Sequence, residues 1–305
     1  MDLETHMRSY QWQGVGRKRK DRMKIVKAFV AKAIYNFETT EILIEYLKGC
    51  KNLRRLCGWE NSWQVPSKST FSRAFTQFSD GHISRDSTAI EVREKPVKKI
   101  SQEHVVQSKR KPGRPRKGEV VAPKAPKRLD QQPERTLEEN LKDLPSQCNV
   151  GTKKNSKGYK ESWIGYKLHL DCIDGDIPVS AILTSASLHD SQAAIPLSQM
   201  SSGRITNLYD LMDSAYDAPQ IHGFSEKLGH KPIIDHNPRG GEKRYMDPAT
   251  HIRFAERSSA ERVNSNLKDN YGGRNIRVKG AVKVMTHLMF GIIVITATQL
   301  FRLLQ

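Results

Sequence analysis

The chain of 305 residues predicts an α/β fold, a mixed sheet with flanking helices. Three observations support this prediction. Apolar residues recur at helical spacing over 21–80, strand-like segments with a hairpin turn signal lie between 82 and 235, and a long apolar stretch closes the chain. A segment over 93–160 that is rich in basic residues and prolines interrupts this order. We therefore expect a small N-terminal helical domain and a disordered basic insertion beside the sheet.

The net charge indicates the kind of partner. Lys and Arg number 51 against 33 acidic residues, which gives a formal charge of +18 and a pI near 9.8. Nucleic acid is the first choice, because basic side chains displace the counterions condensed on phosphates. A ribosomal-type protein and a protein bound to an anionic membrane surface are the alternatives.

Cysteine spacing and apolar content bear on the compartment. The four cysteines form no C-x2-C pair, which argues against a zinc knuckle. The N-terminus has no apolar signal region, so we expect a reducing, cytoplasmic compartment. The apolar stretch 284–301 contains His287 and Gln299, which favours a buried helix over a membrane anchor.

The N-terminal part divides in two. Residues 1–20 are polar, end in four basic residues and predict a flexible arm. Residues 21–80 predict helices, and the segment 66–78 predicts a turn followed by a helix. A helix-turn-helix DNA-binding domain fits this order. A helical bundle that only packs fits it equally well.

The rest of the chain, over 81–305, contains the expected sheet. Asp174-Gly175 is a hairpin turn signal between two strands. The expected strands are 82–93, 163–173, 177–183, 205–213 and 231–235, with helices over 190–200, 218–228 and most of the chain after 254.

Two aspartates stand out in these strands. Asp86 lies in the middle of the first strand, where strand propensity disfavours aspartate, and metal ligation would explain it. An edge-strand charge that discourages aggregation is the alternative. Asp213 follows the apolar strand 205–213, and ligands bind at the carboxyl ends of strands in open sheets. A helix N-cap is the alternative for Asp213.

A third set of residues shares one stripe of a predicted helix. At about 100° per residue, Phe254, Arg257, Glu261 and Lys268 fall on the same face. A carboxylate between two cations suits metal binding beside DNA phosphates. A solvated face with i,i+4 ion pairing is the simpler alternative.

Taken together, these residues resemble the bacterial insertion-sequence transposases with an Asp-Asp-Glu triad. That family carries its glutamate in a Tyr-x2-Arg-x3-Glu-x6-Lys signature, and Phe254, Arg257, Glu261 and Lys268 match it with Phe in place of Tyr. WIGYKLHL at 163–170 and TSASLHDS at 184–191 also resemble the family's strand pair and following turn. The resemblance covers roughly 21–92 and 160–305.

The resemblance implies an RNase H-like fold and a metal-dependent DNA transposase. Asp86, Asp213 and Glu261 would be the catalytic residues and ligands of Mg²⁺, with Mn²⁺ as a possible substitute. Arg257, Lys268 and Phe254 would contact DNA. The partners would be double-stranded DNA at the element's ends and target, held by a homodimer or larger synaptic complex, with no membrane. Nucleoid association in a bacterial cytoplasm follows.

The insertion contains a motif of its own. Thirteen Lys or Arg residues and five prolines lie between Arg93 and Arg128, against three acids. Its core resembles an AT-hook, in which glycine and prolines keep the backbone slim while arginines lie in the narrow A·T minor groove. The expected DNA-binding residues are Lys111, Gly113, Arg114, Pro115, Arg116 and Lys117. A basic linker or a nuclear-localisation-like run is the alternative.

Two other functions remain open at this point. One is a non-catalytic, inactivated or domesticated protein that binds A·T-rich DNA. The other is an RNase H-like nuclease without strand transfer. Acidic residues at all three triad positions favour the transposase over the first of these.

Overall fold

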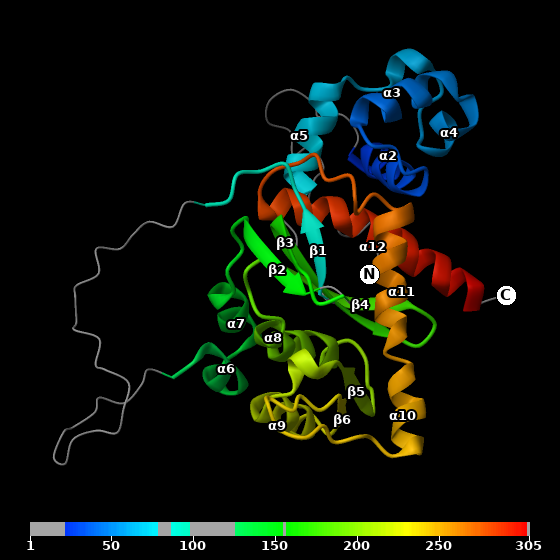
Figure 1. The fold of residues 1–305 in the computed structure, drawn as a ribbon. Helices are drawn as coiled ribbons and strands as arrows, with labels where there is room; N and C mark the ends of the chain where they lie inside the picture. Colours follow the sequence, from blue (N-terminus) through cyan, green and yellow to red (C-terminus); the bar gives the residue numbers. More distant parts are fainter. Residues whose placement is uncertain (1–21, 79–86, 98–125, 155–156, 304–305) are drawn as a thin grey trace, which may run out of the picture.

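The computed structural model describes residues 22–78, 87–97, 126–154 and 157–303 (Figure 1). Three expectations fall outside the described residues: the arm over 1–20, Asp86, and the AT-hook-like residues 111–117.

The N-terminal region is helical, as the apolar spacing predicts. Its elements are α2 (Arg22–Ile34), α3 (Thr40–Gly49), α4 (Lys51–Leu56), the 3-10 helix η1 (Ser62–Gln64) and α5 (Lys68–Phe78). Thr39 begins α3 as an N-cap, since its side chain accepts a hydrogen bond from the Ile42 amide at 3.2 Å. Ile25, Leu43, Leu47 and Phe71 are fully buried and form the centre of this helical core.

A four-stranded antiparallel sheet forms the middle of the molecule. Its strands are β1 (Thr88–Glu91), β2 (Asn149–Lys154), β3 (Lys160–Ile173) and β4 (Ile177–Ser185). β1 and β4 both pair with residues 166–168 of β3, so they lie on its two edges. The expected hairpin between β3 and β4 is confirmed, and Gly175 in its turn has φ 81°.

Close approach of β1 to β3 depends on one glycine. Gly165 has φ 153°, and a Cβ atom there would lie 2.0 Å from the Ile90 carbonyl oxygen. Any side chain would therefore push β1 away from β3.

The remaining strands form a second sheet. β5 (Tyr209–Met212) and β6 (Lys231–Ile234) pair in parallel, with the 3-10 helix η3 (Ser214–Tyr216) and α9 (Pro219–Lys227) between them. α8 (Ser191–Ser202) packs against β4 and α9. The sequence predicts one mixed sheet. Among the described strands the structure has two separate sheets instead, because the described part of β1 pairs with β3 alone.

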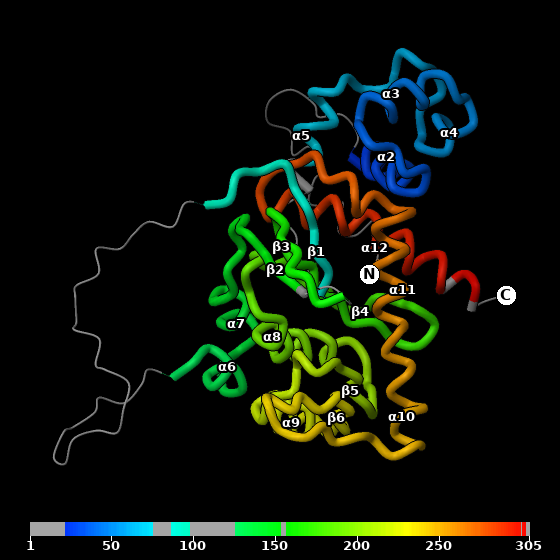
Figure 2. Tube along the Cα trace, in the orientation of Figure 1, coloured from blue at the N-terminus to red at the C-terminus, as the bar shows by residue number. Residues whose placement is uncertain are grey.

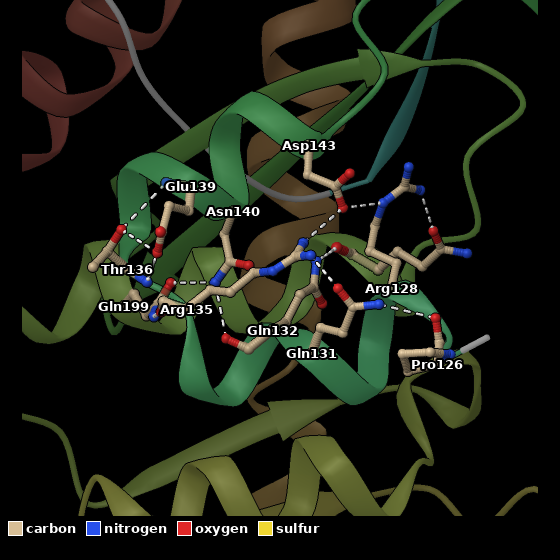
Figure 3. A network of polar contacts seen from close by, with 11 residues as sticks. Pro126, Arg128, Gln131, Gln132, Arg135, Thr136, Glu139, Asn140, Asp143 and Gln199 are labelled. Atoms are coloured by element: carbon tan, nitrogen blue, oxygen red, sulfur yellow. Dashed lines mark hydrogen bonds and ion pairs between the residues drawn. The ribbon is translucent and has the colours of Figure 1, made fainter.

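The predicted linker over 93–160 is partly folded. The structure places α6 (Arg128–Gln131), the 3-10 helix η2 (Gln132–Glu134), α7 (Leu137–Asp143) and β2 in this range. Gln132 and Asn140 are fully buried. The Asn140 amide nitrogen donates to the Gln132 carbonyl at 3.0 Å and to the Gln199 side chain on α8 at 3.0 Å (Figure 3).

Charge composition misled the linker prediction for a physical reason. Arg128 and Arg135, which count as free basic charges in the sequence, both pair with Asp143, at 2.7 and 3.3 Å (Figure 3). Ion pairs and hydrogen bonds, together with leucines of α7 that pack on α8, can hold short helices there without a long apolar run. Residues 126–154 therefore belong to the folded protein.

Three helices complete the chain: α10 (Pro248–Ala255), α11 (Ser258–Asn270) and α12 (Ala281–Leu303). α12 runs between the N-terminal helices and the sheet in both views (Figures 1 and 2). Its Val284, Leu288, Ile292 and Ile295 pack with the sheet. Its Phe290 and Val294 pack with the N-terminal helices, and the Phe290 and Phe29 rings stack 5.3 Å apart.

The packing of α12 explains its apolar composition. By length and composition it is the one helix in the described residues that could cross a membrane, and half of its most apolar window is buried in the protein. A helix that is apolar on several faces is expected where it is covered on both sides. The expectation of a buried closing helix is confirmed by these contacts.

We expect Leu288→Ala to lower the free energy of unfolding by about 2–5 kcal/mol, because it leaves a cavity at a fully buried position of α12. Urea denaturation followed by circular dichroism would measure it. Val282→Ala on the same helix is the control, since Val282 is 54% exposed and its truncation leaves no cavity. Equal effects for the two variants would contradict the packing described here.

Candidate active site

Asp213 lies at the carboxyl end of β5, where the sequence places it. It is the N-cap of η3, and its Oδ1 accepts a hydrogen bond from the Ala215 amide at 2.9 Å. The capping role expected as an alternative is therefore present. A cap uses one lone pair of a carboxylate, so the remaining oxygen is left for another partner.

The charges around Asp213 define the site. Burial raises the pKa of Asp213, while the Ala215 hydrogen bond and the Arg257 guanidinium lower it. The neighbouring carboxylates of Asp190 and Glu261 raise it further, so the pKa lies above its ordinary value. Asp190 just before α8, Arg257 just before α11 and Glu261 on α11 thus all act on Asp213 just after β5.

Glu261 lies in the first turn of α11 and pairs with Arg257. The Arg257 Nη2 atom is 2.8 Å from Glu261 Oε1. The Glu261 side chain is 62% exposed and that of Arg257 is 31% exposed. The i,i+4 ion pair expected as an alternative is therefore present. Its two members, Arg257 and Glu261, both also shift the pKa of Asp213.

Phe254 lies on α10, and the single continuous helix expected from 254 to 268 is wrong. The Glu256 and Arg257 amides bond to the carbonyls three residues earlier, which tightens the chain between α10 and α11. Phe254 and Arg257 remain in contact although they lie on either side of this break between the helices. The Arg257 guanidinium lies 5.5 Å from the Phe254 ring centre. The Arg257 Nε atom is buried and has no hydrogen-bond partner among the described residues.

Lys268 lies in a different surrounding. It is seven residues beyond Glu261 on α11, or roughly 10 Å along a helix. Burial lowers the pKa of Lys268, and Lys153 and Arg274 lower it further. Glu91 and Asp269 oppose that shift, and none of these four charges is among those that act on Asp213.

The first turn of α11 is fastened to the β3–β4 hairpin. Ser259 Oγ donates to Asp176 Oδ1 at 2.8 Å, and Arg262 Nη2 lies 2.8 Å from the same oxygen. Arg262 and the hydrogen bond from Ser259 outweigh burial and lower the pKa of Asp176. Because Ser259 and Arg262 flank Glu261 in sequence, these contacts hold the backbone of Glu261 in place.

Asp190 is the site residue that sequence reasoning missed. Its Oδ1 accepts from Lys167 Nζ on β3 at 2.9 Å and from Ser87 Oγ at 2.8 Å. Ser87 directly follows Asp86 in the chain, so Asp190 fastens the segment that leads to Asp86. The stretch TSASLHDS contains Asp190, but only the fold brings it to Lys167, 23 residues earlier.

β3 supplies this polar network from one of its faces. Lys167, His169 and Asp171 alternate along the strand and therefore share a face. His169 is fully buried with its Nε2 2.8 Å from Thr184 Oγ1, and Asp171 accepts from Ser201 of α8 at 2.5 Å. The alternate residues Tyr166, Leu168 and Leu170 pack with α11 and α12.

The described residues include two of the three expected metal ligands, Asp213 and Glu261. Within the ranges that the structure describes, no three Asp, Glu, His or Cys side chains are grouped closely enough to hold a metal ion. Asp86, the first expected ligand, lies outside those ranges. Asp213 and Glu261 supply hard oxygen donors, and the charge of Glu261 acts on Asp213, which suits Mg²⁺.

Comparison with known proteins identifies the family. The chain matches a family described as "Transposase DDE domain" over residues 78–297 and one described as "Transposase domain (DUF772)" over residues 2–77. The first match covers more than half of the chain, so the protein belongs to the Transposase DDE domain family. Searches of curated proteins and of solved structures returned no match. The expected relation to insertion-sequence DDE transposases is thereby confirmed.

We expect Asp190→Asn to destabilise the protein by about 1–2 kcal/mol at pH 7, because Lys167 loses a charged hydrogen-bond partner in a mostly buried setting. Burial raises the pKa of Asp190, but His169, Lys167 and the hydrogen bonds from Lys167 and Ser87 lower it below its ordinary value. The stabilisation is therefore present above about pH 4, the unfolded pKa, and is lost as the pH falls through the lower folded pKa.

Denaturation of both proteins between pH 7 and pH 3 would measure this. The gap in unfolding free energy between wild type and variant should shrink in the most acidic samples. Asp174→Asn, in the exposed β3–β4 turn, is the control and should match the wild type throughout. A gap that stays constant down to pH 3 would show that the Asp190 charge does not contribute as described.

Proposed function

We propose that this transposase cuts DNA at the ends of a mobile element and joins the freed 3′-hydroxyl to target DNA. One observation carries the proposal. The structure brings Asp213 and Glu261, 48 residues apart, near enough for Glu261 to raise the pKa of Asp213, with Arg257 beside both. Carboxylates gathered at strand ends beside an arginine suit phosphoryl chemistry on a polyanion.

We assign metal binding to Asp86, Asp213 and Glu261. Their oxygen donors favour Mg²⁺, with Mn²⁺ as a substitute. Divalent cations at such a site supply activation of the attacking oxygen and stabilisation of the leaving 3′-oxygen. The raised pKa of Asp213 supports this assignment, because burial first, and then the charges of Asp190 and Glu261, destabilise its carboxylate, which a bound cation would stabilise.

The chain's own cations would position the DNA. Arg257 contacts Phe254 and pairs with Glu261, and its side chain is partly exposed, so its guanidinium would meet a phosphate that approaches the carboxylates. Lys268 would contact the same strand farther along α11. One phosphodiester replaces another in strand transfer, so the reaction needs no external energy source.

We further propose an RNase H-like arrangement of the strands. β1, β3 and β4 are antiparallel, with β3 between the other two, and β5 and β6 follow as a parallel pair separated by α9. In this arrangement Asp86 would lie just before β1 and face the end of β5. The hydrogen bond from Ser87 to Asp190 supports this placement, since Asp190 also acts on Asp213.

The other two regions would bind DNA away from the chemistry. The N-terminal helices would hold the element's ends, and Lys111, Gly113, Arg114, Pro115, Arg116 and Lys117 would bind A·T-rich minor grooves. A homodimer or larger synaptic complex would pair the two ends. A non-catalytic A·T-rich DNA-binding protein and a nuclease without joining activity are the alternatives. A strand-transfer assay with a pre-cut end separates them from the transposase.

We expect Asp213→Asn to retain DNA binding and to lose cleavage in Mg²⁺ by on the order of 10³-fold, since metal stabilisation of several kcal/mol corresponds to about a factor of ten for each 1.4 kcal/mol. Gel-shift and cleavage assays on the same DNA would measure both. Asp235→Asn is the matched control, because Asp235 follows the neighbouring parallel strand and pairs with Lys243. Cleavage by Asp213→Asn at the rate of this control would leave Asp213 with its capping role alone.

We expect replacement of both Arg114 and Arg116 by Ala to weaken binding to A·T-rich duplexes and to reduce the salt dependence of binding, because fewer counterions are released. Cleavage of a pre-bound end at low salt should survive. The control replaces Lys98 and Lys99, which removes the same charge from the same segment outside the motif. If both double variants bind A·T-rich DNA alike, the segment acts through charge and not as an AT-hook.

A further inference from the structure

A pocket of about 500 Å³ lies between the N-terminal helices and the C-terminal part of the protein. α2, α3 and α5 line one side, and the α11–α12 loop and α12 line the other. The two sides belong to the regions matched by the two transposase families, which meet at residues 77 and 78. The pocket is separate from the candidate active site, because neither Asp213 nor Glu261 lines it. Its volume suits a group the size of a nucleotide.

Positive charge dominates the lining. Five cationic side chains line the pocket against two carboxylates: Lys32, Lys68, Arg277, Lys279 and Lys283 against Glu38 and Glu41. Both carboxylates are already engaged, Glu38 with Arg277 and Glu41 with Lys68. Lys32, Lys279 and Lys283 make no ion pair with any residue that the structure describes. Three ammonium groups therefore line one pocket without a direct ion pair among the described residues, although the charge of Glu38 acts on Lys32.

The most enclosed of these groups is Lys32. Burial lowers the pKa of Lys32 to about 8, and the nearby Arg277 contributes to the same shift, which the carboxylate of Glu38 only partly opposes. An amine held out of water next to another cation is destabilised until an anion arrives. Lys279 and Lys283 approach the same space from the other side of the pocket and are exposed.

His287 fixes the wall of the pocket without adding charge. Burial, followed by the charge of Lys32, lowers the pKa of His287 to about 4, so it is neutral at pH 7. Its Nε2 donates to the Gly272 carbonyl at 2.9 Å, since a carbonyl oxygen can only accept. This bond ties α12 to the loop that leads to Arg277 and Lys279. This hydrogen bond thus fixes the loop that carries Arg277 and Lys279 relative to α12.

The two sides of the pocket are already joined by direct contacts. Asn36 donates to the Asp269 carbonyl at 3.3 Å, and Arg277 pairs with Glu38 across the boundary. A ligand in the pocket would therefore add to an existing junction. An anion with several oxygens could accept from lysines on both sides at once, as a phosphodiester does.

We propose that this pocket binds a phosphate of the DNA backbone through Lys32, Lys279 and Lys283, so that one DNA contact joins the N-terminal helices to the catalytic part. The proposal rests on DNA being the substrate, as proposed above. It assigns to the chain a DNA contact that lies away from Asp213 and Glu261 and outside the AT-hook-like motif. DNA held there would couple end binding to the relative placement of the two regions.

The test compares the double variant Lys279→Gln/Lys283→Gln with wild type. Both lysines are exposed, so the variant should fold, which a melting curve would check. Affinity for a duplex from the DNA that flanks the coding region is measured across a range of salt concentrations by fluorescence anisotropy. We expect at least about tenfold weaker binding at low salt and a salt slope smaller by up to about 0.9, since that is the contribution of one phosphate contact. The control variant, Lys142→Gln/Lys227→Gln, removes two exposed lysines that do not line the pocket and should bind like wild type.

A second measurement uses the unaltered protein. Acetylation of lysines followed by mass spectrometry should show that DNA protects Lys32, Lys279 and Lys283 and leaves Lys142 reactive. Unchanged affinity and slope in the double variant, with no protection of these lysines, overturns the proposal. DNA binding with protection but without cleavage or joining would instead contradict the proposed transposase activity and leave the pocket assignment standing.

Discussion

The structure depends on the simultaneous burial of α12 from two sides. Leu288 and Val284 are fully buried against the sheet, while Phe290 and Val294 are buried among the N-terminal helices. Apolar surface on both sides is stabilising only when both partners cover it. One helix thus fixes the position of the sheet relative to the N-terminal helices. It also forms one wall of the basic pocket. It also determines where α11 lies, because Leu267 of α11 packs in the same core as Leu288.

β3 connects the core around α12 to the candidate site, because one face of the strand packs in that core and the other face contacts Asp190. Its apolar residues, such as Leu168, join the core with α11 and α12. Its polar residues, such as Lys167, hold Asp190 and through it Ser87. Because successive side chains point to opposite faces, a register shift of one residue would exchange the two sets. The packing of α12 and the geometry of the carboxylates are therefore set by the same strand.

The carboxylates of the site are balanced by cations of this chain. Arg257 pairs with Glu261 and lowers the pKa of Asp213, while Lys167 neutralises Asp190. The structure therefore separates two roles among acids that lie close together. Asp190 has a lowered pKa and a fixed partner, which suits a positioning group. Asp213 has a raised pKa and, among the residues that the structure describes, a capping contact alone, which leaves it available to a further cation.

The sequence by itself determined the features that depend on local pattern. Helical periodicity placed the N-terminal helices and α12, the Asp174-Gly175 turn placed the hairpin, and the end of an apolar strand placed Asp213. Spacing along a helix also predicted the pairing of Arg257 with Glu261. Contacts between distant segments were decided only by the tertiary structure: the link of Asp190 to Lys167 and Ser87, the folding of residues 126–154 on α8, and the basic pocket. Local periodicity records which face of an element is buried, but the partner of a polar side chain depends on which elements pack together.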